Sequence, residues 1–399
     1  MKAWAPVFLF WVGACSSTHS GPDSANQGGS SGIGGAMTAG SSAEAMGGAS
    51  GSILLPELPT ERSVVAKHWF DPDGISSVRS VTSRGDVVYL AGVPHGARID
   101  LAARRESTLS PSPDTSWSFD SVAAPAGSSV LVAVLVRGES ERLIRYSADD
   151  GASWQTASAP STGASAWSRL SWVRSESGAT RIFALYGGPT LDMSEDNGAS
   201  WRRVVAHDDI TWPAAGFAAD ASGKVLWAAG EAVLDKVLAA RLDLGQSELA
   251  SDWTQEIAYS ESNGVYSAAA DPGEPSAVYI GCEGRLGYLL FDSDGAFSIE
   301  TPWTADLANG EPFTYVWAIW ADPLVPKHVY FGGGDRTAIR LHESNNRGGQ
   351  AQELAFETAP AGTLIGIVPQ TNTSDLFLFV GSDGTKGAFG APRVYVRAR

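Results

Sequence analysis

The sequence predicts an all-β fold, a seven-bladed β-propeller whose blades are four-stranded antiparallel sheets. Three observations support this fold class. A short turn motif ending in tryptophan recurs, β-rich stretches separated by turn residues lie between its copies, and an unassigned alternating stretch at 63–70 is available to complete the last blade. A period of forty to fifty residues is typical of propellers and related repeat proteins. Six and eight blades are the alternative counts.

Two clear copies of the motif begin at Ser147 and Ser194, which are 194 − 147 = 47 residues apart. A carboxylate at the third position can accept backbone N–H bonds in a tight turn, glycine allows a positive φ, and tryptophan packs between sheets. We therefore interpret the motif as structural rather than as an acidic catalytic cluster. Its residues are Ser147, Asp149, Gly151, Trp154, Ser194, Asp196, Gly198 and Trp201, with Ser344, Asn346 and Gly348 in a degenerate third copy.

Each copy is expected to precede the outermost strand of a blade. With looser copies at 114–117, 251–253 and 292–297, this predicts outer strands at 118–122, 155–158, 202–205, 254–257, 298–300 and 353–356. The last set of strands, at 364–368, 376–380 and 394–396, has no outer strand after it. Placing 63–70 there closes the ring and removes exposed sheet edges.

Composition restricts the partners. The formal net charge is 28 − 44 = −16, so the chain has no basic field of the kind that binds a phosphate backbone, and nucleic acid is not an expected partner. The two cysteines, Cys15 and Cys282, are not expected to form a disulfide. Cys282 lies in an apolar alternating run, which predicts a buried, unreactive thiol. We expect a monomer.

The N-terminal segment resembles a bacterial lipoprotein signal. Lys2 is followed by an apolar run at 3–12 and by Val12-Gly13-Ala14-Cys15, which is similar to the lipobox. The resemblance implies a signal peptide at 1–15, a lipidated Cys15 as the only membrane contact and, because Ser16 follows it, the outer membrane of a Gram-negative bacterium. Residues 16–52 contain ten serines and ten glycines, so we expect a disordered tether at 16–58 and a single propeller domain at 59–399.

The turn motif resembles the Asp-box, or bacterial neuraminidase repeat (BNR), of a broad β-propeller superfamily. That superfamily includes sialidases, xyloglucanases, sortilin-type receptors and photosystem-assembly propellers, so the resemblance implies a fold but no single activity. Sialidases carry an Arg-Ile-Pro motif, whereas the nearest match here is Arg181-Ile182-Phe183. No catalytic residues are assigned on this basis.

Ligands of such propellers bind opposite the Asp-boxes, on loops between the second and third strands and between blades. Aromatic rings stack on sugar rings, and carboxylates form hydrogen bonds with sugar hydroxyl groups. The cluster of acidic and aromatic residues at 207–212 is therefore the densest candidate for a sugar site, and the alternative interpretation is a solvated turn. The candidate residues on this face are His207, Asp208, Asp209, Trp212, Asp335 and Arg336. The six histidines show no metal-ligand spacing, so neither a metal nor a cofactor is expected.

These observations favour a lipid-anchored, non-enzymatic propeller that binds a glycan or an envelope or extracellular protein. One alternative is an extracellular glycoside hydrolase of sialidase-like or xyloglucanase-like fold, which would need two suitably spaced carboxylates. A second alternative is a factor for envelope assembly or scaffolding.

Overall fold

The computed structural model describes most of the chain after its N-terminal segment. The described residues are 52–58, 65–138, 141–159, 168–174, 178–186, 190–205, 215–219, 225–233, 236–243, 255–258, 265–291, 296–305, 315–334, 339–357, 362–370, 373, 375–381 and 392–398. All of them belong to one compact unit, Met46–Arg399. Among them, no helix has the length and apolar character needed to cross a bilayer.

The described strands form seven antiparallel sheets. The innermost strands are β3 (Ser77–Arg84), β7 (Ser118–Ala123), β11 (Ser168–Arg174), β15 (Ala215–Ala219), β19 (Val265–Ala270), β23 (Tyr315–Ala321) and β27 (Thr363–Pro369). The second strands are β4 (Val87–Val93), β8 (Leu131–Arg137), β12 (Thr180–Tyr186), β16 (Val225–Val233), β20 (Ala277–Cys282), β24 (Val329–Gly334) and β28 (Asp375–Gly381).

The third strands are β5 (Gly96–Asp100), β9 (Glu141–Ser147), β13 (Thr190–Ser194), β17 (Lys236–Asp243), β21 (Arg285–Phe291), β25 (Ile339–Ser344) and β29 (Arg393–Ala398). The outermost strands are β6 (Arg105–Leu109), β10 (Gln155–Thr156), β14 (Arg202–Val205), β18 (Gln255–Ala258), β22 (Phe297–Thr304), β26 (Gln352–Leu354) and β2 (Lys67–Phe70). One further short strand, β1 (Ile53–Leu54), pairs with β6.

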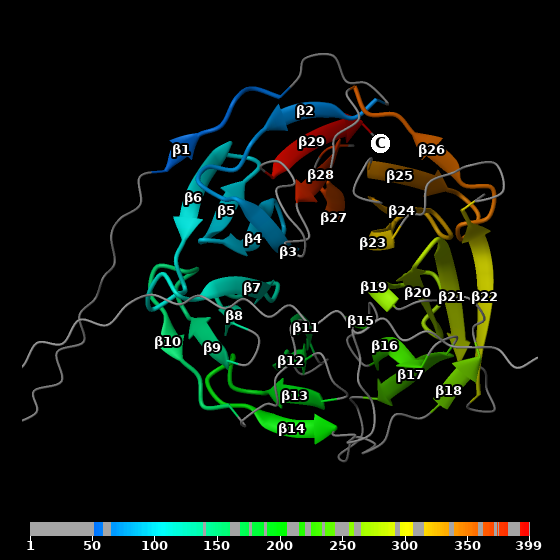
Figure 1. The fold of residues 1–399 in the computed structure, drawn as a ribbon, viewed down its shortest axis with the longest axis horizontal. Coiled ribbons are helices and arrows are strands. Elements are labelled where there is room, and N and C mark those ends of the chain that lie inside the picture. Colours follow the sequence, from blue (N-terminus) through cyan, green and yellow to red (C-terminus); the bar gives the residue numbers. More distant parts are fainter. Residues whose placement is uncertain are drawn as a thin grey trace, which may run out of the picture. The chain divides into compact units, whose positions relative to one another are not determined.

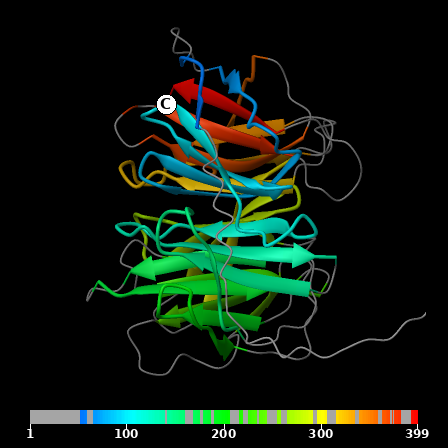
Figure 2. The ribbon, with the colours of Figure 1, turned by 90° about the vertical axis from the view of Figure 1, so that its left-hand side faces the viewer.

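The sheets are arranged radially, as expected for a β-propeller (Figure 1). Each innermost strand contacts the innermost strand of the next sheet, and β27 contacts β3, so the row of inner strands returns to its start. Figure 2 shows neighbouring sheets stacked face to face. Where the structure describes their side chains, as in β4, β8, β20, β24 and β28, the second strands are buried over most of their length, which explains why they read as continuous apolar runs such as Leu131–Val136.

The predicted closing strand is confirmed. In β2, Lys67 pairs with Val396 and His68 with Tyr395 of β29, so residues from near the two ends of the propeller share one sheet. Trp69 of β2 is 5% exposed and packs on Phe377, with ring centroids 5.2 Å apart.

Two predictions about the first sheets are wrong. The first sheet has five strands rather than four, because β1 adds to the edge of β6. The predicted outer strand at 118–122 is instead β7, the innermost strand of the second sheet. The turn before it is an Asp turn, in which the carboxylate of Asp114 accepts the N–H of Ser116 at 2.8 Å. Such turns also connect sheets, so the motif alone does not identify the strand that follows.

Candidate ligand site in the axial channel

The residues of the predicted turn motif form tight turns between third and fourth strands. In the first copy, Ser147 Oγ accepts the N–H of Gly151 at 2.8 Å and donates to Asp149 at 2.7 Å. The carboxylate of Asp149 accepts the N–H of Ser153 at 2.8 Å, and the hydrogen bonds from Ser153 lower its pKa. These bonds lie within the turn, which is the arrangement that a structural role requires.

The second copy repeats this geometry, since Ser194 Oγ accepts the N–H of Gly198 at 2.8 Å and Trp201 Nε1 donates to the carbonyl of Gly198 at 2.9 Å. The degenerate copy keeps the serine bond, because Ser344 Oγ accepts the N–H of Gly348 at 3.0 Å. Asn346 closes this turn through its carbonyl, which accepts the N–H of Gly349 at 2.8 Å.

The other predicted sites lie outside the described residues. These are Cys15 and the candidate ligand-face residues His207, Asp208, Asp209, Trp212, Asp335 and Arg336. The part of the chain that the structure describes contains no group of three or more potential metal ligands. Cys282 is a buried free thiol.

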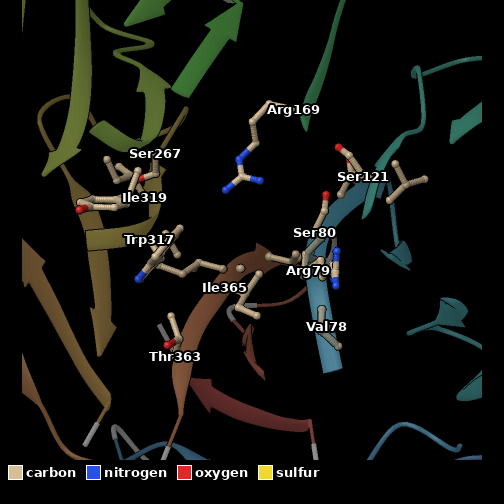
Figure 3. A pocket seen from close by; sticks show the side chains of 18 of the residues that line it. Val78, Arg79, Ser80, Ser121, Arg169, Ser267, Trp317, Ile319, Thr363 and Ile365 are labelled. Atoms are coloured by element: carbon tan, nitrogen blue, oxygen red, sulfur yellow. The ribbon is translucent and has the colours of Figure 1, made fainter. Parts of the chain in front are cut away.

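The candidate site is a cavity of about 250 Å³ on the axis of the ring (Figure 3). The described lining residues come from the innermost strands β3, β7, β11, β19, β23 and β27. Its polar lining combines two guanidinium groups, those of Arg79 and Arg169, with hydroxyl groups from several sheets. The serines and threonines of the lining are Ser80, Thr82, Ser121, Ser267 and Thr363.

β-Bulges shape this cavity. In five innermost strands the pairing register slips by one residue at a corresponding position, leaving an extra residue unmatched. The five extra residues are Arg79, Asp120, Tyr266, Trp317 and Ile365. A bulge re-aims its side chain away from the regular alternation of a strand. Four of these residues line the cavity, and the fifth, Asp120, forms an ion pair with one of them, Arg79.

A buried carboxylate, that of Asp120, holds the guanidinium group of Arg79. Asp120 is 1% exposed, and its Oδ1 accepts Arg79 Nη1 at 3.2 Å across the boundary between two sheets. Burial lowers the pKa of Arg169, and the negative charge of Asp120 opposes this effect. The N–H of Leu170 donates to Ser121 Oγ at 3.2 Å, which fixes the start of β11 beside β7.

Aromatic rings form another part of the lining. The rings of Tyr266 and Trp317 lie 4.7 Å apart between centroids, and Tyr266 also meets Tyr315 edge-on at 5.3 Å. Ser267 Oγ donates to the carbonyl of Val316 at 2.8 Å and ties the two bulged strands together. The site can therefore offer hydrogen bonds to an anion together with an apolar ring surface.

None of these cavity residues is predicted as a site residue from the sequence. A bulge inserts a single residue into a strand, so it produces no repeating sequence pattern by which it could be predicted. The second strands do carry a sequence feature that accompanies the bulges, because a glycine lies near each of four of them. These glycines are Gly92, Gly281, Gly333 and Gly381, and an added Cβ at each would lie within 3.0 Å of a backbone or side-chain atom.

No protein-family model and no curated protein matches this chain. Several solved structures are similar in fold. A chain of the "Mitotic Checkpoint Complex" has a TM-score of 0.59 and 14% identity, covering 87% of this chain and 98% of that chain. Hydrazine synthase of Kuenenia stuttgartiensis has a TM-score of 0.58 and 10% identity, covering 82% and 97%. "YCF48 bound to D1 peptide" has a TM-score of 0.54 and 13% identity, covering 86% and 100%. At such identities the likeness shows the β-propeller fold alone.

Proposed function

We propose that this chain is a non-enzymatic binding propeller for a protein partner, part of which enters the axial cavity. The observation that carries the proposal is the chemistry of the cavity lining. Among the described residues that line it, the cavity offers guanidinium, hydroxyl and aromatic groups but no carboxylate, imidazole or thiol. These groups suit recognition by hydrogen bonding and ring contact, whereas hydrolysis by a hydroxyl group needs a neighbouring general base, most often an imidazole or a carboxylate.

Two of the similar structures support a protein partner over a glycan. One contains a propeller bound to a D1 peptide, and the other is a chain of a multiprotein complex. An envelope assembly or scaffold factor would be one form of such a binding protein.

A glycoside hydrolase is the alternative in a different class. Such enzymes place two carboxyl groups either about 5–5.5 Å or about 6.5–9.5 Å apart around the scissile bond. The described lining of the axial cavity does not supply such a pair. Catalysis would have to use Asp208 and Asp209, which lie outside the described residues.

Blocking the cavity tests the proposal. We expect Ser80→Trp, which fills the cavity from β3, to reduce in-cell crosslinking of the full chain to one defined partner by at least tenfold. Thr115→Trp places the same side chain on an exposed turn and should leave crosslinking unchanged. Equal crosslinking by both variants would contradict a cavity role. If the purified chain released reducing sugar from a polysaccharide and Asp208→Ala abolished that release, the proposed binding function would be wrong and the chain would be a glycoside hydrolase.

The proposed location is the outer membrane, with Cys15 as the lipidated residue. The basis is the lipobox-like segment, Val12-Gly13-Ala14-Cys15. We expect Cys15→Ser to move the chain from the membrane fraction to the soluble fraction and to remove labelling by a fatty-acid probe. Cys282→Ser is the matched control, because it removes the other thiol. A Cys15→Ser chain that is still labelled would contradict the proposed anchor.

A further inference from the structure

We propose that the axial cavity binds a free carboxylate beside an aromatic ring, of the kind that ends a peptide chain with an aromatic last residue. The two arginines would hold the carboxylate, and the rings of β19 and β23 would pack against the aromatic group. This inference rests on the proposed function for its assignment of the group to a protein partner. The site chemistry stands on the geometry of the cavity itself.

The charge of the site favours a single carboxylate. The described charged groups at the cavity are Arg79, Arg169 and Asp120, which sum to 2 − 1 = +1. This positive site lies in a chain whose formal net charge is −16, so the local charge does not follow from composition. A guanidinium matches a carboxylate with two parallel N–H bonds, and its planar fork suits partly buried sites.

The size of the site favours an end group over a whole ligand. Pockets that enclose a complete small molecule usually measure about 300–1,000 Å³. At about 250 Å³, this cavity is below that range and suits the terminal part of a larger molecule. Figure 3 shows Arg169 reaching into the cavity, with Arg79 and Trp317 on different walls, so one group can meet both a cation and a ring.

The bulges of the innermost strands position the cationic and aromatic side chains of the cavity. Arg79, Tyr266 and Trp317 are each the extra residue of a bulged innermost strand. A bulge leaves one residue unpaired and locally disrupts the hydrogen bonding between two strands. Bulges are frequent beside functional sites, where they redirect a side chain. Groups carried by strands are positioned more rigidly than groups on loops, which suits recognition of a small, charged end group.

The test uses the full chain and two matched probes, N-acetyl-L-phenylalanine and its neutral amide. Titration calorimetry or ligand-observed NMR should show binding of the acid, with the amide at least tenfold weaker. N-acetyl-L-alanine keeps the carboxylate but lacks the ring, and should also bind at least tenfold more weakly. Equal binding of acid and amide would overturn the role of the carboxylate. Equal binding of the phenylalanine and alanine acids would overturn the role of the ring.

Variants locate the probe. Arg169→Gln should weaken binding of the acid at least tenfold, whereas Arg137→Gln removes an exposed guanidinium outside the cavity and should not. If Arg169→Gln does not fold, Arg169→Lys takes its place, because lysine keeps the positive charge but lacks the planar guanidinium group. Weaker binding of the acid by a folded Arg169→Lys variant then supports the site. Unchanged binding in the folded variant overturns it.

Two further outcomes separate this inference from the proposed function. Binding of the acid without any partner captured in cells would support the carboxylate site and contradict the protein-binding function. A partner lost on Ser80→Trp, combined with no binding of the acid, would support the function and overturn the carboxylate site. Binding of D-glucuronate in preference to N-acetyl-L-phenylalanine would overturn the peptide assignment in favour of an acidic sugar.

Discussion

Single buried charges are the features of this propeller whose effects on pH dependence can be assigned most directly. Glu106 of β6 is 4% exposed, and its Oε1 accepts the N–H of Asp73 at 3.1 Å. Burial raises the pKa of Glu106 to about 7, and the nearby charge of Asp73 adds to the increase. The carboxyl group is therefore more readily protonated in the folded chain than in the unfolded chain.

Glu106→Gln should stabilise the fold at alkaline pH. Because the folded pKa is about 7 and the ordinary value is 4.5, the contribution of Glu106 to stability is complete below 4.5 and is lost as pH rises through 7. Glutamine keeps a carbonyl acceptor for the N–H of Asp73 and never ionises. We expect the variant to match the wild type at pH 4 and to exceed it by up to about 3 kcal/mol at pH 8.

The measurement is the free energy of unfolding in urea at pH 4, 6 and 8. Glu141→Gln is the control, because Glu141 is an exposed carboxylate paired with Arg137. A Glu106→Gln variant that is less stable than the wild type at pH 8 would show that the ionised carboxylate is favoured in the fold.

At the scale of elements, the fourth position of the turn motif makes contacts between neighbouring sheets. Asp150 has a φ of 60° and reaches the preceding sheet, where it accepts Arg98 Nε at 2.9 Å and Tyr89 Oη at 2.6 Å. Arg347 occupies the same position in the degenerate copy with a φ of 54°, and its Nε lies 3.6 Å from Asp271 of the preceding sheet. In the first contact the turn supplies the carboxylate, and in the second it supplies the guanidinium group. Both contacts join the same position of the turn to the preceding sheet.

Asp150→Asn should weaken the first of these contacts without altering the turn. Asparagine accepts the left-handed backbone, as Asn197 with a φ of 62° does at the same position of the second copy. The carboxylate of Asp150 also forms an ion pair with Arg84. The side chains of Asp150, Arg84 and Arg98 are 15–29% exposed, so solvent should reduce the loss of stability. We expect the unfolding free energy to fall by about 1–3 kcal/mol.

Chemical unfolding at pH 7 measures this loss. Asn197→Asp is the reciprocal control, since it adds a carboxylate at the equivalent turn position and should change stability by less than about 0.5 kcal/mol. A loss for Asp150→Asn no larger than for this control would mean that Asp150 acts only through its backbone conformation.

Gly281, beside one of the bulges, is required by close approach between two sheets. A Cβ added to Gly281 of β20 would lie 2.3 Å from Ser267 Oγ and 2.3 Å from the carbonyl oxygen of Val316 in the next sheet. The backbone oxygen belongs to a bulged strand that lines the cavity, so it cannot move without disturbing the site. Gly281→Ala should therefore destabilise the fold by about 1–3 kcal/mol or more.

Thermal unfolding of Gly281→Ala should show this cost as a lower Tm. Gly273→Ala is the matched control, because an added Cβ there meets atoms no closer than 3.4 Å. An unchanged Tm for both variants would indicate that the bulged strands adjust freely, and would weaken the view that they hold the axial side chains rigidly.

At the scale of the whole molecule, the sequence predicts the propeller better than its axial site. The turns of the repeated motif are predictable because Asp149, Gly151 and Trp154 each have a local physical role. The closing strand is predictable because residues 63–70 alternate between apolar and polar side chains. Asp120 was placed on an outer strand, because an Asp turn precedes it and such turns occur both within and between sheets. The described residues that line the cavity come from six strands, and their convergence follows from the bulges and the ring rather than from local sequence patterns.

Ring closure makes the N-terminal strand part of the global fold, and Trp69 is the residue that tests this. Trp69 is 5% exposed, packs against Phe377 at 5.2 Å between ring centroids, and donates Nε1–H to the carbonyl of Pro56 at 3.1 Å. Truncating a buried tryptophan to alanine costs about 3–5 kcal/mol. Because β2 is the outermost strand of the sheet that contains β27–β29, we expect Trp69→Ala to lower the stability of the whole ring in one transition.

Urea unfolding followed by circular dichroism, together with limited proteolysis, distinguishes global from local loss. Leu324→Ala is the control, since Leu324 is 78% exposed and its truncation should leave the midpoint unchanged. For Trp69→Ala, the midpoint should fall and protease should cut strands throughout the ring at the same denaturant concentration. Cleavage confined to residues 65–70, with an unchanged midpoint for the remainder, would show that β2 covers the last sheet without closing the ring energetically.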